Sequence, residues 1–251
     1  MNWENMGKQF PMAFKESEKR VSPSSPRNLF REPTLNKYHV DSAKNIGEMF
    51  NDYIDSICEA ICDAISKWMN MASVASLIIN GPVGSILPCG VIGPSLTPLI
   101  MARAPNNTLW NMKYSSAIAN AFGTQWQGWH MGLTGTIMYP SFESFPGSTA
   151  PPTPNEPVPL MTLSSPGEVG LSPEALKQMM EKNLGHSHAL HSSDLFDSIA
   201  RAFNTVFQIF KASTLVTNVL GTGPVPLFAP PASSAGAVLM GSSVPTPGVF
   251  K

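Results

Sequence analysis

The chain has 251 residues, and 43% of them are hydrophobic, which is enough for a sizeable buried core and excludes a chain that is disordered throughout. Charged residues make up 13%, about half the usual quarter, and the formal net charge is -1. This balance provides no overall field to attract nucleic acid or an anionic membrane, so we expect no sequence-specific nucleic-acid partner.

The first part of the chain is its most charged part. Half of the 16 basic residues lie in the first 50 positions, where they alternate with acidic ones. Such a mixed-sign segment is typical of a solvated tail, and we interpret residues 1–45 as an extended polar N-terminal arm. The segment lacks the basic-then-apolar order of a secretory signal, and Cys58, Cys62 and Cys89 outline no disulfide framework, so we expect assembly in a reducing compartment.

The rest of the chain contains an internal repeat. A shift of 142 positions aligns Asp55–Ile57 with Asp197–Ile199, and Gly81–Val83 with Gly223–Val225. A shift of 61 gives a weaker middle copy, in which Trp68 aligns with Trp129. Self-similarity of this kind indicates repeated structural units. The predicted divisions are the arm at 1–45, repeat one at 46–104, repeat two at 105–162, a Pro/Ser-rich link and helix at 163–192, and repeat three at 193–251.

Each copy opens with apolar residues at positions 0, 4, 8 and 11, which fall on one face of a helix. We expect these residues to form the core or a subunit interface; burial in the core is the plainer interpretation. They are Ile57, Ile61, Ile65 and Trp68 in copy one, Ile118, Phe122, Trp126 and Trp129 in copy two, and Ile199, Phe203, Phe207 and Phe210 in copy three.

An uncharged run follows each stripe and then gives way to a Gly/Pro-rich segment. Periodicity leaves open whether the run continues the helix or becomes a strand. The Gly/Pro-rich segment cannot be regular helix, so it predicts turns and short edge strands. The expected fold class is therefore α+β, with three diverged repeats, each an amphipathic helix followed by a Gly/Pro-rich segment, behind an extended N-terminal arm.

Two features interrupt the pattern between copies two and three. Residues 140–166 are rich in Pro and Ser and indicate an extended polyproline-like surface segment. After it, Ser172 as N-cap, Pro173 in the first turn and Gly185 at the end predict a helix over 173–184.

Two uncharged stretches, 69–102 and 212–250, are long enough to span a bilayer. Both contain Gly-Pro pairs and further prolines, which would leave backbone groups unpaired in lipid. We therefore expect no transmembrane helix.

Side chains capable of chemistry are few. His186, His188 and His191 could bind zinc or nickel, but they lie in a polar link without partnering ligands, and an ordinary solvated link is favoured. Cys58 and Cys62 could form half a metal site, although inert packing is the plainer interpretation.

The carboxylates Asp52, Asp55, Glu59 and Asp63 are expected on the solvated side of the first helix. No nucleophile, dinucleotide or phosphate motif is formed, so we expect no enzyme, cofactor, small-molecule substrate or bound metal.

The succession of helical stripe, uncharged segment and Gly-Pro-Val or Pro-Val-Pro-Leu string, in the copies at 55–101, 116–162 and 197–243, resembles structural proteins of tailed bacteriophages, particularly tail and baseplate components. The resemblance implies a virion protein that assembles in the host cytoplasm and contacts other structural proteins and copies of itself. It transfers no functional residue.

Two alternatives belong to other classes. An oligomeric membrane-associated or pore-forming protein would place the uncharged segments against lipid. A metalloenzyme would use the Cys58/Cys62 pair together with the His186, His188 and His191 group.

Overall fold

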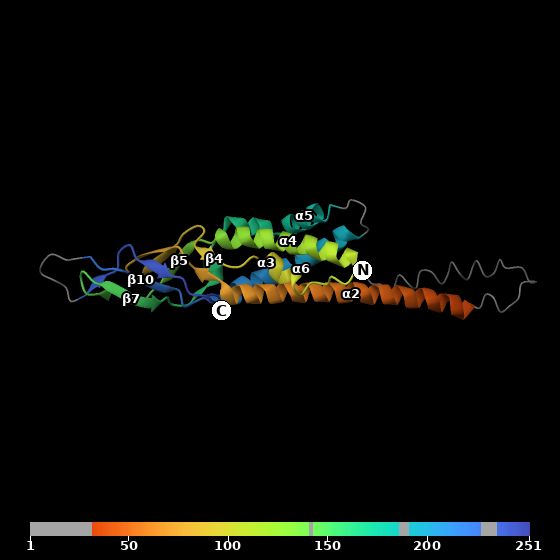
Figure 1. Ribbon diagram of the computed structural model, residues 1–251, viewed down its shortest axis with the longest axis horizontal. Coiled ribbons are helices and arrows are strands. Elements are labelled where there is room, and N and C mark those ends of the chain that lie inside the picture. The colour runs from red at the N-terminus through yellow and green to blue at the C-terminus, as the bar shows by residue number, and fades with distance from the viewer. Residues whose placement is uncertain (1–31, 141–142, 186–190, 227–234) are drawn as a thin grey trace, which may run out of the picture. The chain divides into compact units, whose positions relative to one another are not determined.

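The computed structural model describes residues 32–140, 143–185, 191–226 and 235–251 (Figure 1). It is 52% helical and 22% strand, which confirms the α+β class. By internal contacts the chain divides into two units, residues 1–56 and residues 57–251. The second unit contains the C-terminal part of the first described helix and every helix and strand after it.

Helices come from all three predicted copies. They are α2 (Glu32–Met71), α3 (Leu96–Met101), α4 (Leu109–Met131), α5 (Pro173–Leu184) and α6 (Ser192–Ser213), with the 3-10 helices η1 (Leu160–Thr162) and η2 (Pro166–Leu171). Among the described residues, no helix is both long and apolar enough to cross a membrane.

The strands are short and pair antiparallel. They are β1 (Ser73–Val74), β2 (Leu77–Asn80), β3 (Val83–Ile86), β4 (Val91–Ile92), β5 (Gly135–Met138), β6 (Glu143–Ser144), β7 (Thr149–Pro154), β8 (Val158–Pro159), β9 (Leu215–Val216), β10 (Leu220–Pro224), β11 (Gly236–Ala237) and β12 (Ser242–Val244). Two sheets have three strands, in the orders β2-β3-β5 and β12-β10-β7, and the pairs β1-β4, β11-β6 and β8-β9 complete the set.

Helix α2 begins within the predicted arm. Residues 32–45 are helical, whereas we expected an extended segment, and residues 1–31 of that arm lie outside the described residues. The apolar spacing explains the difference, because Ile46, Phe50 and Tyr53 continue the stripe of copy one toward the N-terminus. Pro33 falls in the first turn, where its missing N–H costs nothing.

Helix α5 has the predicted bounds, 173–184. The Ser172 hydroxyl oxygen accepts a hydrogen bond from the Ala175 N–H at 3.4 Å, and Gly185 ends the helix with a φ of 63°. Ser172 therefore caps the N-terminus of the helix with its hydroxyl, and Gly185 ends the helix because glycine adopts the left-handed conformation without steric cost.

The uncharged run after each stripe becomes strand rather than more helix. Helix α2 ends at Met71 and is followed by β1 and β2; α4 ends at Met131 before β5; and α6 ends at Ser213 before β9 and β10. Within the second unit, the helices gather at one end and most strands at the other (Figure 1). The Pro-rich segment takes part in this sheet structure, since β7 pairs with β10 as an edge strand, the position where proline is tolerated.

Helix α4 is the centre of the helical part, in contact with α3, α5 and η2. The contact with α3 requires Gly123, because a Cβ atom there would lie 2.0 Å from the Thr97 hydroxyl oxygen and 3.0 Å from the Thr97 backbone nitrogen. Elsewhere in the helical part, η2 is tied to α6 by an ion pair between Glu168 and Lys211, whose ammonium also lies 5.5 Å from the ring centroid of Phe207.

Two glycines of α4 give a matched test of this packing. Gly123→Ala should lower the free energy of unfolding by about 1–3 kcal/mol, because α3 must move. Gly128→Ala should instead raise it by up to about 1 kcal/mol, because a Cβ at Gly128 meets nothing within 4 Å and alanine favours helix. Urea unfolding of both variants measures the difference, and equal effects would contradict the requirement for glycine at position 123.

Candidate functional site

The twelve stripe residues all lie on α2, α4 and α6. Nine are buried, and the exceptions, Ile65, Phe203 and Phe210, are half-buried. Side chains from all three helices meet in one group, which we call the aromatic cluster; it consists of Trp68, Trp126, Trp129, His130, Phe207, Phe210 and Phe250.

The aromatic cluster contains edge-to-face, tilted and stacked pairs. The Trp68 and Trp126 ring centroids are 5.2 Å apart with the planes at 87°, and Trp129 meets Phe207 at 5.2 Å and 81°. Phe250 stacks on Trp68 at 5.1 Å and 30°. Pairs of this kind add about 0.5–1.5 kcal/mol each beyond their burial, so the cluster contributes to the stability of the helical part.

Three indole N–H groups are buried in the aromatic cluster and have no hydrogen-bond acceptor among the described residues: those of Trp68, Trp126 and Trp129. Edge-to-face packing compensates in part, because the positive edge of one ring meets the negative face of another. The Trp68 indole also packs directly on the backbone of Gly93, where a Cβ atom would lie 2.3 Å from the indole nitrogen. These donors therefore belong to a closely packed core.

His130 is the titratable member of the aromatic cluster. It is buried, its ring lies 5.4 Å from that of Trp68, and its Nδ1 is 2.9 Å from the Trp126 carbonyl oxygen. Because a carbonyl oxygen only accepts, Nδ1 carries the proton of the neutral ring. Burial holds the pKa of His130 below its ordinary value of 6.5, and the hydrogen bond to Trp126 offsets this only in part.

A lowered histidine pKa makes stability depend on pH in a definite direction. The unfolded chain binds the proton first, so His130 should cost no stability above about pH 6.5 and an increasing amount as the pH falls toward the folded pKa. The slope should not exceed about 1.4 kcal/mol per pH unit, the value for one proton. His130→Asn, which keeps a donor but does not titrate, should flatten this part of a urea-unfolding pH series. An unchanged slope in that variant would show that His130 is not responsible.

A second notable site lies among the strands, where the two Gly-Pro-Val segments of the repeat come together. The Gly81 N–H donates to the Val238 carbonyl oxygen at 2.7 Å, and the Leu239 N–H donates to the Pro224 carbonyl oxygen at 3.1 Å. Thus the turn at 238–241 is held between residues of copy one and copy three. We call this arrangement the Gly-Pro-Val junction.

Exposed apolar residues lie in the Gly-Pro-Val junction and beside it. Met138, Leu239 and Met240 are 42%, 47% and 72% exposed, and Pro82 and Pro224 are exposed as well. Met138 pairs with Val83 in the β3–β5 register, next to Pro82. These five residues, Pro82, Met138, Pro224, Leu239 and Met240, form what we call the junction surface, and none of them is charged.

The backbone at the junction is both tight and strained. A Cβ atom on Gly223 would lie 2.4 Å from the Gly241 Cα, so glycine is required for this approach. Met240 has a φ of 55°, a left-handed conformation that is unusual for a large side chain and costs of order 1–3 kcal/mol. The Asn80 side-chain oxygen holds it there by accepting the Met240 N–H at 3.0 Å.

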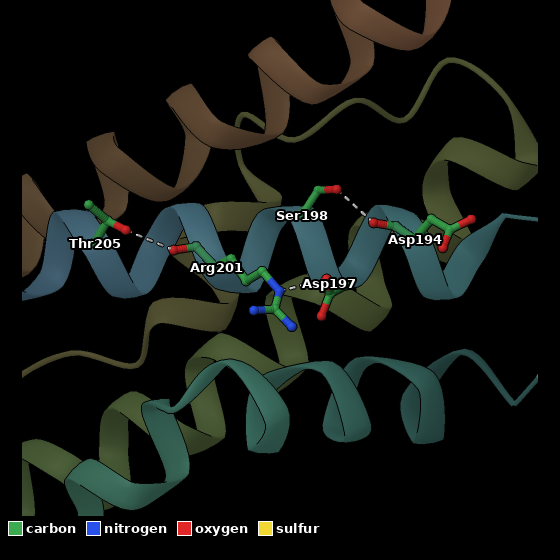
Figure 2. A network of polar contacts seen from close by, with 5 residues as sticks. All are labelled: Asp194, Asp197, Ser198, Arg201 and Thr205. Atoms are coloured by element: carbon green, nitrogen blue, oxygen red, sulfur yellow. Dashed lines mark hydrogen bonds and ion pairs between the residues drawn. The ribbon is translucent and has the colours of Figure 1, made fainter. Parts of the chain in front are cut away.

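The polar residues on the surface of α6 form ordinary helix contacts (Figure 2). Arg201 Nε donates to Asp197 at 2.7 Å, and the hydroxyls of Ser198 and Thr205 donate to the carbonyl oxygens of Asp194 and Arg201, one turn earlier. The hydrogen bond from Arg201 lowers the pKa of Asp197. Such pairs add little stability and provide no reaction centre.

The residues that could have bound metal are not brought together in the described part of the chain. Cys58 is half-buried and Cys62 exposed, and no group of three or more His, Cys, Asp or Glu side chains there could hold a metal ion. His191 is exposed, and His186 and His188 lie outside the described residues.

The predicted carboxylate face is solvated for the most part. Asp52, Asp55 and Glu59 are exposed. Asp63 is half-buried and pairs with Lys67 at 2.7 Å and with Arg103 at 3.1 Å. The hydrogen bond from Lys67 is the largest cause that lowers the pKa of Asp63. This pattern is that of helix-surface charges, as expected.

Sequence reasoning did not identify His130, Phe250 or Asn155. Asn155 is buried in the Pro-rich segment, where its side chain donates to the Val216 carbonyl oxygen at 3.0 Å and accepts the Val219 N–H at 2.9 Å. It thereby holds the turn between β9 and β10. His130 directly follows a stripe residue, which is a weak signal, whereas nothing in the sequence marks Phe250 or Asn155.

Comparisons with models of protein families, with curated proteins and with solved structures give no significant match to this chain.

Proposed function

We propose that this chain is a structural subunit of a large symmetric assembly, a tail or baseplate component of a tailed-bacteriophage virion, and that it works through subunit packing rather than catalysis. The junction surface is the observation that supports subunit packing, because it gathers exposed apolar side chains around a strained turn, as interaction sites do. The virion assignment rests on the resemblance of the sequence to tail and baseplate proteins.

The charge distribution supports protein contacts at this end of the second unit. The segments 73–92, 135–156 and 215–250 contain no Lys or Arg, and Glu143 and Glu156 are their only acidic residues. A surface without basic residues does not attract anionic lipid or nucleic acid, and a surface almost without charge meets little repulsion from another copy. The partners proposed are accordingly copies of this chain and other structural proteins of the particle.

The arrangement of copies one and three supports a repeated unit. Helix α2 ends at Met71 and α6 at Ser213, and β1 and β9 begin at Ser73 and Leu215, so both pairs differ by the same 142 positions that align the sequences. Three diverged repeats in one chain would give pseudo-threefold symmetry from one subunit, or pseudo-sixfold from two, which suits a ring around a tail axis. The proposal includes assembly of the particle in the host cytoplasm.

Native mass spectrometry and light scattering of the full chain test the proposal. The wild-type protein should form a defined oligomer at micromolar concentration. Met240→Asp, which puts a charge on the junction surface, should weaken association at least about tenfold, equivalent to about 1.4 kcal/mol. Met161→Asp is the matched control, because Met161 is 61% exposed but lies on η1, outside the junction surface, and it should leave the oligomer intact.

A wild-type chain that stays monomeric would overturn the proposed self-assembly. Equal weakening of association by Met240→Asp and Met161→Asp would show that the junction surface is not the surface through which the subunits associate. The virion assignment has its own test, which is whether the protein co-purifies with virus particles at a fixed stoichiometry.

A further inference from the structure

The Gly-Pro-Val junction contains a chemically labile pair. Asn80 is followed by Gly81, the single Asn-Gly sequence in the chain. Asn-Gly pairs are the most prone to spontaneous deamidation, because glycine has no side chain to hinder attack by its backbone nitrogen on the neighbouring amide. Here the pair lies at the turn between β2 and β3, Asn80 is exposed, and a Cβ on Gly81 would meet nothing within 4 Å.

Both groups that would react are held by the turn at 238–241. The Gly81 nitrogen, which is the nucleophile, donates its hydrogen to the Val238 carbonyl oxygen at 2.7 Å. The Asn80 amide, which is the electrophile, accepts the Met240 N–H at 3.0 Å through its oxygen. Ring closure requires both groups to leave these partners and approach each other, so these contacts hinder it for as long as the turn stays in place.

The turn at 238–241, which holds both reacting groups, contains a strained and exposed segment. The middle of the turn is exposed, since Leu239 and Met240 are 47% and 72% exposed, and Met240 has a φ of 55°. Its two ends are held, because Val238 is buried and Gly241 exchanges two hydrogen bonds of 2.9 Å with Ile79. The strain at Met240 and the exposed middle favour local opening between these ends. We propose that Asn80 is a deamidation site gated by the 238–241 turn, protected while the turn is closed and converted when the turn opens.

The chemistry needs only water. With the turn open, the Gly81 nitrogen loses its proton and attacks the Asn80 side-chain carbonyl carbon, a C–N bond forms, and the side-chain nitrogen leaves as ammonia. Water then opens the resulting succinimide at either carbonyl, which gives aspartate or isoaspartate at position 80. No oxidant, reductant or second protein takes part.

The products would change the junction surface. Either product adds a negative charge beside Pro82 and Met240, and isoaspartate also lengthens the backbone of the tight β2–β3 turn. Insofar as the proposed function holds, deamidation would weaken subunit contacts, so that chains whose junction has opened lose the ability to assemble. The site itself stands independently of that function.

The test follows conversion at Asn80 by peptide mass spectrometry in the full chain at neutral pH. The folded wild-type protein should convert at least about tenfold more slowly than the urea-unfolded chain, as expected for a reaction that requires local opening. Met240→Gly keeps the N–H that holds Asn80 and relieves the left-handed strain, so it should slow conversion in the folded chain further, by about threefold.

Gly241→Ala should act in the opposite direction. Its Cβ would lie 2.8 Å from the Thr222 carbonyl oxygen and must displace the turn, so conversion should accelerate while circular dichroism stays native. Should that variant not fold, Met240→Gly alone decides. The proposal is overturned if folded and unfolded wild-type chains convert at the same rate, or if Met240→Gly converts as fast as the wild type. Both rates are measured at a protein concentration at which light scattering shows a monomer, so that they report on the turn and not on subunit contacts.

Discussion

The contact of Trp68 with Trp126 and Trp129 joins α2 to α4, and the contact of the same α4 tryptophans with Phe207 and Phe210 joins α4 to α6. No one of these helices could cover its own aromatic stripe, so each depends on the other two for burial. The aromatic cluster therefore fixes where the three helices end relative to one another. Because each helix is followed within a few residues by a strand, it also fixes where the strands begin.

Because the strands begin at these fixed positions, segments that are distant in the sequence come into contact. The Gly-Pro-Val segments of copies one and three lie far apart in sequence, yet both bond to the turn at 238–241. Two contacts position the junction surface, which is not part of the buried core. They are the tight backbone approach of Gly223 to Gly241 and the hydrogen bond from the Met240 N–H to the Asn80 side chain. In this account the helices provide stability, and the junction surface provides the contacts of the proposed assembly.

Local signals in the sequence were enough to predict some of this structure. The spacing of the stripes predicted three helical faces, on which nine of the twelve residues are buried, and Ser172, Pro173 and Gly185 defined α5 because capping depends only on neighbouring residues. The predicted extended conformation of residues 32–45 was wrong, since a mixed-charge segment can be either a tail or a helix surface.

Features that depend on long-range contacts could not be predicted. The pairing of Thr153 with Gly221, the stacking of Phe250 on Trp68 and the hold of Asn155 on the β9–β10 turn all join segments that are remote in sequence. The choice of strand after each stripe is of the same kind, because a short uncharged run fits helix or strand until its partner is known.

Native-state hydrogen exchange of a Trp68→Leu variant tests the central claim most directly, which is that one aromatic cluster stabilises all three helices. Trp68 contacts α4 directly, and it reaches α6 through the tryptophans of α4 and through Phe250, which pairs with Val216 just after α6. If the cluster is one cooperative unit, the amides of α2 from residue 57 onward, of α4 and of α6 should lose protection by the same free energy. Loss confined to α2, with α6 protected as in the wild type, would contradict the account.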